Sequence, residues 1–160
     1  MWRECNTFLD IIKNFLQINI FSTLASNAIA SIPSGVFSHL QYLKQVELRG
    51  NPIHFYHPDA FIHLPSLNKL QMLGSPGRDL NTFPNLTGSP MLELIHLDRL
   101  NLASVPENIC SLAPRLHTLW VENLLIEAGS FSLLIVFRRL RSNKLTDLPI
   151  LANCTDLVQL

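Results

Sequence analysis

Two histidines, His54 and His57, stand three residues apart, a spacing that on a helix would place two metal ligands on one face. They follow Pro52 in an expected loop and have no third ligand nearby, so no metal site is predicted. Gly74 and Gly77 lack the strand, the Lys and the Ser or Thr of a phosphate-binding loop. No local motif joins a Ser, a His and an Asp as a triad. The residues therefore predict no catalytic site and no cofactor, and the protein is not expected to be an enzyme.

Composition narrows the possible partners. The chain has 160 residues, with 12 basic and 12 acidic side chains, so its formal net charge is zero and gives no electrostatic reason to expect nucleic acid or an anionic membrane. An apolar fraction of 48% against 15% charged residues is enough to form a core. The apolar run 124–137 is shorter than the roughly 20 residues that span a bilayer, so no membrane span is expected. Asp10 and Lys13 interrupt the N-terminal apolar run, and no secretory signal is recognised there.

One pattern returns along the chain. Asn27 is followed 24 residues later by Asn51, and Phe37 by Phe61. Apolar triplets with strand-like spacing recur as well: Leu43, Val46 and Leu48; Leu67, Leu70 and Met72; Leu92, Ile95 and Leu97; Leu116, Leu119 and Val121. This is the L-x-x-L-x-L-x-x-N-x-L pattern of leucine-rich repeats.

The pattern predicts an α/β-type leucine-rich repeat solenoid, with short parallel strands on the concave face and an irregular or short helical convex side. Alternating apolar residues direct one face of each strand into a core. The Asn side chain satisfies backbone groups left open where the chain turns between coils. No single coil can bury its apolar face, so neighbouring coils must stack.

Two segments depart from the repeat. We expect a non-repeat segment at 1–23, leucine-rich repeats at 24–123, a non-repeat insertion at 124–139 and a truncated repeat at 140–160. The repeat resumes in the same register at Leu24 and at Leu140, which favours retained non-repeat sequence over chance insertion. The alternative is an atypical capping helix at the start and a convex-side insertion later.

The residues between the buried strand positions are the candidate binding residues, because they point to the concave face. They form three columns: Glu47, Gln71, His96 and Trp120; Arg49, Leu73, Asp98 and Glu122; Gln45, Lys69, Leu94 and Thr118. Mixed charges with an exposed tryptophan suit a protein partner, in whose interfaces aromatic and Arg anchors carry much of the energy. The alternative is a solvated strand face without a ligand.

Two asparagines, Asn85 and Asn153, begin tripeptides of the N-glycosylation type, Asn85-Leu86-Thr87 and Asn153-Cys154-Thr155. The three cysteines are too few and too scattered to define a disulfide framework or a zinc site. Cys110 takes the position of a core Phe and is expected to be a small buried apolar residue.

A closer resemblance begins at Gly50-Asn51-Pro52-Ile53. It continues through Ala60-Phe61 and Leu64-Pro65, and then through Phe83-Pro84 and Leu86-Thr87-Gly88. Further along stand Leu92-Glu93-Leu94, Asp98-Arg99, Val105-Pro106, Cys110, Pro114-Arg115-Leu116 and Leu148-Pro149. In this order the segments resemble the ectodomain of the leucine-rich-repeat-containing G-protein-coupled receptors, the R-spondin-binding group above all, over about 120 of the 160 residues.

The resemblance implies a fragment of a plasma-membrane receptor whose extracellular repeats bind a secreted protein ligand, R-spondin-like or hormone-like, for transmembrane signalling. The glycoprotein-hormone and relaxin receptors share the architecture. The alternative is a soluble or extracellular-matrix leucine-rich repeat protein that mediates protein–protein interaction without a signalling domain. An intracellular repeat scaffold is disfavoured by the resemblance and by the two glycosylation tripeptides.

Overall fold

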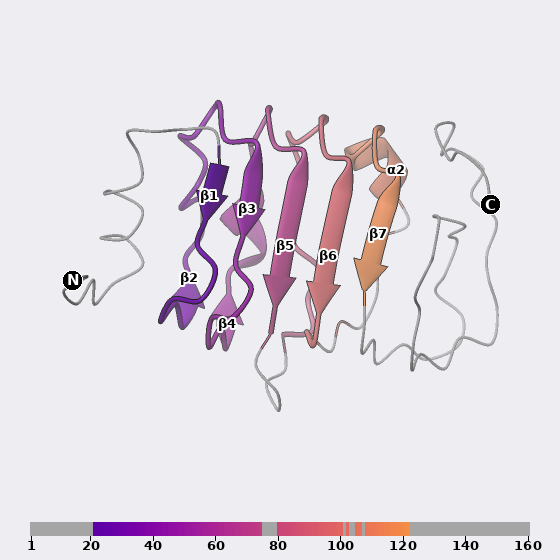
Figure 1. Ribbon diagram of the computed structural model, residues 1–160. Coiled ribbons are helices and arrows are strands. Elements are labelled where there is room, and N and C mark those ends of the chain that lie inside the picture. Colours follow the sequence, from indigo (N-terminus) through magenta and orange to yellow (C-terminus); the bar gives the residue numbers. More distant parts are fainter. Residues whose placement is uncertain (1–20, 75–79, 101, 103–104, 107, 122–160) are drawn as a thin grey trace, which may run out of the picture.

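The computed structural model describes residues 21–74, 80–100, 102, 105–106 and 108–121. Five parallel strands form one sheet in the order β1-β3-β5-β6-β7: Phe21–Thr23, Gln45–Glu47, Lys69–Leu73, Leu94–Asp98 and Thr118–Val121. The strands lie side by side in chain order, each reached by one turn of the coil (Figure 1). This arrangement confirms the predicted leucine-rich repeat solenoid with short parallel strands.

The strand register follows the repeat step. Phe21 pairs with Gln45, and Gln45 with Lys69, each 24 residues further on. Lys69 pairs with Leu94, a step of 25, and Leu94 pairs with Thr118, again a step of 24. One additional residue therefore lies between β5 and β6, and the pairing of equivalent positions continues across it.

Little helix is present in the described part of the chain. The side opposite the sheet carries a second, two-stranded parallel sheet of β2 (Ser31–Ile32) and β4 (Phe55–Tyr56), and a short 3-10 helix, η1 (Pro58–Phe61). A single turn of α-helix, α2 (Ile109–Leu112), precedes β7. The irregular, short helical convex side is thus confirmed, whereas the β2–β4 pair was not predicted.

One continuous core runs through the coils. The apolar strand positions Val46, Leu70, Ile95 and Leu119 are buried, at 2% exposure or less. On the convex side the rings of Phe37 and Phe61 stack with centroids 5.6 Å apart. Because each coil supplies the same layer of side chains, burial continues from coil to coil.

The end of each strand is turned by a residue pair. The first member has positive φ at Ser26 (56°), Gly50 (72°) and Arg99 (54°). The second member is Asn51 in the second coil, and it is 6% exposed. Its Oδ1 accepts hydrogen bonds from the backbone N–H groups of Asn27 and Ile29, both at 3.1 Å, and its Nδ2 donates to the carbonyls of Leu24 and Leu48 at 2.7 and 2.9 Å. Asn51 therefore joins two coils, as the repeat pattern predicts for its slot.

The first domain boundary needs correction. Strand β1 lies within the segment 1–23 that we placed outside the repeats, yet it pairs with β3 at the same 24-residue step as the next strands. The strand of the first repeat therefore starts before residue 24. The predicted insertion at 124–139 and the last repeat at 140–160 lie outside the described residues and stay predictions.

Candidate protein-binding face

The main sheet has one face turned away from the core, which we call the ladder face. Burial alternates along the strands, with half-buried positions at Gln45 and Glu47 of β3 and at Leu94, His96 and Asp98 of β6. The ladder face consists of Gln45, Glu47, Lys69, Gln71, Leu73, Leu94, His96, Asp98, Thr118 and Trp120, with Arg49 just after β3. The register brings Glu47, Gln71, His96 and Trp120 into one column, as the spacing predicts.

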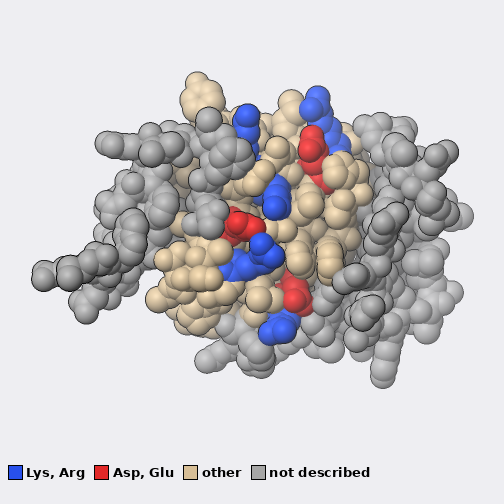
Figure 2. Space-filling view, in the orientation of Figure 1, with Lys and Arg blue, Asp and Glu red and all other residues tan. Residues whose placement is uncertain are grey.

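Charges of both signs are interspersed on this side of the molecule (Figure 2). Glu47 Oε1 accepts a hydrogen bond from Arg49 Nη2 at 2.7 Å, and Lys69 Nζ lies 4.0 Å from the same oxygen. Asp98 Oδ2 lies 3.9 Å from Arg99 Nε. Because these pairs are partly exposed, each adds little to stability, and their charges remain available to steer a charged partner.

An aromatic pair lies across β6 and β7. The rings of His96 and Trp120 stack with centroids 4.6 Å apart and an interplanar angle of 20°. Both side chains are half-buried, so each presents part of its ring on the ladder face. A stacked, partly exposed tryptophan is a pre-ordered apolar contact of the kind that anchors protein interfaces.

Gln71 differs from its neighbours in the column. It is only 8% exposed, and its Oε1 is buried without a hydrogen-bond partner among the described residues. The sequence placed Gln71 among the outward residues, and the strand position is as predicted, but the side chain is largely covered. Leu73 is half-buried. Glu122 lies outside the described residues, so its place on the face stays a prediction.

The residues tested for other chemistry have structural roles. His57 precedes η1, where its Nδ1 accepts a hydrogen bond from the Asp59 backbone N–H at 3.1 Å. In the described ranges no group of three or more His, Cys, Asp or Glu side chains is placed to hold a metal ion. Within those same ranges no helix has the length and apolar character needed to cross a bilayer.

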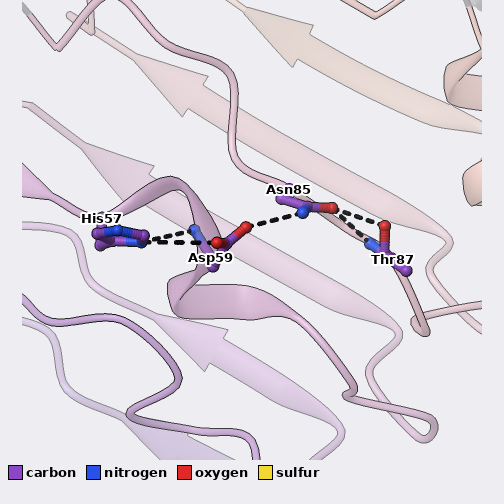
Figure 3. A network of polar contacts seen from close by, with 4 residues as sticks. All are labelled: His57, Asp59, Asn85 and Thr87. Atoms are coloured by element: carbon purple, nitrogen blue, oxygen red, sulfur yellow. Dashed lines mark hydrogen bonds and ion pairs between the residues drawn. The ribbon is translucent and has the colours of Figure 1, made fainter.

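Asn85 lies on the convex side, away from the ladder face, in a polar network with His57, Asp59 and Thr87 (Figure 3). Its Nδ2 donates to Asp59 Oδ1 at 2.8 Å, and its Oδ1 accepts from the Thr87 N–H and hydroxyl at 3.1 and 2.7 Å. The link to Asp59 was not predicted. Its only signal in the sequence is a separation of 26 residues, close to one coil. Asn153 lies outside the described residues.

The expectation for Cys110 is wrong. It is half-buried rather than fully buried, and it is disulfide-bonded. Three scattered cysteines gave no framework from which to predict this bond, because the spatial proximity of coils cannot be read from their spacing. A structural disulfide is typical of proteins that fold in an oxidising compartment.

The parallel ladder and its repeating coils define a leucine-rich repeat protein, and the leucine rich repeat family model matches residues 23–75. The chain carries a repeat region related to that of the leucine-rich repeat-containing G-protein coupled receptors. It is 35% identical over 94 residues to receptor 4 of Rattus norvegicus, which is 59% of this chain and 10% of that protein.

Two further relatives agree. The chain is 32% identical over 102 residues to receptor 6 of Homo sapiens, covering 64% of this chain and 10% of the relative. Identity to receptor 5 of Homo sapiens is 34% over 103 residues, covering 62% and 11%. The chain thus spans about a tenth of the length of these receptors. The family relation indicates a region that takes part in protein–protein interaction.

Proposed function

We propose that the ladder face binds a secreted protein ligand as part of a receptor's extracellular repeat region, with the signalling performed by a membrane-anchored part of the parent protein. The chain itself is a binding module and not an enzyme. The similarity to G-protein coupled receptors supports the receptor setting. The disulfide at Cys110 supports an extracellular location.

The observation that carries the proposal is the stack of His96 on Trp120 in the middle of a half-buried, mixed-charge sheet face. Ordering a flexible side chain on binding costs free energy, and a ring already held against a neighbour avoids much of that cost. Asp98 lies two residues after His96 on the same strand and face. Glu47, Arg49 and Lys69 supply charges of both signs further along the sheet.

Gln71 adds a specific expectation about the ligand. Its buried, unpaired Oε1 lies in the column between Glu47 and His96. A hydrogen-bond donor from a bound protein would satisfy this oxygen, and leaving such an atom unpaired is costly. We propose that the ligand places a donor at this point, so that one end of the contact is polar and the other, at Trp120, is aromatic.

Binding to a purified R-spondin, and in parallel to a glycoprotein hormone, tests the proposal by surface plasmon resonance on the secreted chain. We expect Trp120→Ala to weaken binding of one of the two about 30-fold, as for an interface anchor worth roughly 2 kcal/mol. His96→Ala and Asp98→Asn should each weaken it several-fold. Tyr42→Ala is the matched control, because Tyr42 is 73% exposed and lies before β3, off the ladder face.

Unchanged affinity in all three ladder-face variants would overturn the proposal for this face. The second candidate is a soluble or matrix repeat protein without a signalling domain, favoured by the same protein-binding face. The two candidates differ in the parent gene. Seven apolar segments of about 20 residues following the repeats decide for the receptor.

A further inference from the structure

A possible modification site lies on the far side of the molecule from the ladder face. Asn85 begins the tripeptide Asn85-Leu86-Thr87, with Leu86 fully buried and Thr87 exposed. Residues 85–88 run beside the preceding coil, because the Asn85 N–H donates to the Pro58 carbonyl and the His63 N–H to the Thr87 carbonyl. The acceptor side chain is therefore held in a fixed position on the convex side.

The hydrogen bonds of Asn85 leave room for one substituent on its amide nitrogen. Both bonds to the carbonyl oxygen Oδ1 come from Thr87. The nitrogen Nδ2 has two hydrogens, and one of them is donated to Asp59 Oδ1 at 2.8 Å. Replacing the other hydrogen by a sugar keeps the hydrogen bond to Asp59 and both bonds to Thr87.

The surroundings are open on the side of Asp59. The side chains of His57 and Asp59 are 44% and 42% exposed, and both belong to the network in Figure 3. Thr82, Thr87 and Gly88 are exposed as well. A bulky, hydrated group attached at Asn85 would thus meet solvent and not the core.

We infer that Asn85 carries an N-linked glycan, and that Asp59 anchors the glycosylated amide to the preceding coil through the remaining N–H. This inference rests on the extracellular location proposed above. In the transfer step Nδ2 attacks C1 of the first sugar of a lipid diphosphate-linked oligosaccharide. The C1–N bond forms, the C1–O bond to the diphosphate breaks, the lipid diphosphate leaves with the electron pair, and the amide loses one proton.

Two consequences follow for the molecule. The glycan covers the convex side between the second and third coils and leaves the ladder face free for a protein ligand. Because Asp59 and Asn85 belong to neighbouring coils, the glycosylated amide also remains part of a contact that joins them. Asp59 is in this sense a positioning residue for the glycan.

Secretion of the chain from cultured animal cells behind a cleavable leader, followed by peptide mass spectrometry, tests the modification. We expect an N-acetylhexosamine-bearing peptide at Asn85, lost in Asn85→Gln and in Thr87→Ala. Unmodified Asn85 in the secreted chain overturns the inference. Asn153 in the same chain then separates the two failures: glycan there leaves the extracellular location standing, whereas bare asparagine at both positions counts against that location too.

The role of Asp59 is tested by removing the glycan in two ways, in an Asn153→Gln background. An endoglycosidase leaves one sugar on Asn85, whereas an amidase converts residue 85 into an aspartate that faces Asp59. Like charges at this distance repel, so the melting temperature of the amidase product should be lower by roughly 3 °C. The difference should disappear in Asp59→Asn and persist in the control Asp98→Asn. Equal melting temperatures of the two wild-type products overturn the anchoring role.

Discussion

The coil that ends at Asn51 and the coil that ends at Leu100 turn the chain at the same slot with opposite chemistry. Asn51 makes four hydrogen bonds to the backbone of two coils. Leu100 is a fully buried apolar residue that cannot make any of them. The first solution binds the coils through directional polar contacts, and the second through close packing. The same fold is thus stabilised by different forces in its two halves.

Gly74 shows how close that packing is. A Cβ atom built on Gly74 would lie 2.3 Å from the Arg99 carbonyl oxygen and 2.8 Å from Leu100 Cδ2. At the equivalent Gly50 the nearest atom would be Ser26 Oγ at 3.0 Å, and the constraint there is the positive φ of 72°. The backbones of neighbouring coils thus approach more closely at the apolar turn than at the Asn51 turn.

The largest effect is expected from replacing the polar solution by the apolar one. Asn51→Leu leaves two N–H groups and two carbonyls without this partner, so we expect the free energy of unfolding to fall by about 3 kcal/mol. The urea midpoint measures the change. Asn27→Leu is the control, because the Asn27 amide bonds only to Leu24 and Ala25 of its own coil, and it should cost about 1 kcal/mol or less. Equal midpoints for the two variants would contradict the comparison.

Adding one methyl group to each turn sharpens the contrast. Gly74→Ala forces backbone to move and should cost about 2–3 kcal/mol. Gly50→Ala adds a strained left-handed residue with a mild contact, and we expect about 1 kcal/mol. Thermal unfolding of both variants ranks them, and a larger loss for Gly50→Ala would show that packing against Arg99 is looser than described.

The smallest effect concerns Tyr56, whose hydroxyl donates to the Thr82 carbonyl across the boundary between the two halves. Tyr56→Phe removes this bond and should cost about 1 kcal/mol at neutral pH. Burial raises the pKa of Tyr56 above its ordinary value of 10.0, so folding favours the neutral phenol. The resulting stability is fully present below pH 10.0 and is lost as pH rises toward the raised pKa of the folded state.

A pair of alkaline titrations followed by circular dichroism checks the sign. Wild-type stability should decline more steeply above pH 10.0 than that of Tyr56→Phe. Parallel curves for the two proteins would mean that Tyr56 ionises without opposing the fold.

Much of this architecture was predictable because the repeat imposes the same demands on each coil. The triplets around Val46, Leu70, Ile95 and Leu119 predicted the strands, their register and the outward column from Glu47 to Trp120. Strand β1 was missed because the leucine triplet does not mark Phe21–Thr23. The covering of Gln71 and the disulfide at Cys110 depend on which side chains meet in space, and the strand spacing does not encode this.

The uniform 24-residue step from β1 to β5 makes the length of the array a quantity that changes in whole coils. Loss of residues 45–68 would bring Lys69 opposite Phe21 and keep every strand partner in register. The 25-residue step between β5 and β6 does not permit the same exchange without one residue left over. Gene duplication or deletion can therefore extend or shorten the first half of the array without disturbing its hydrogen bonds, whereas the junction at Gly74 fixes its own two neighbours.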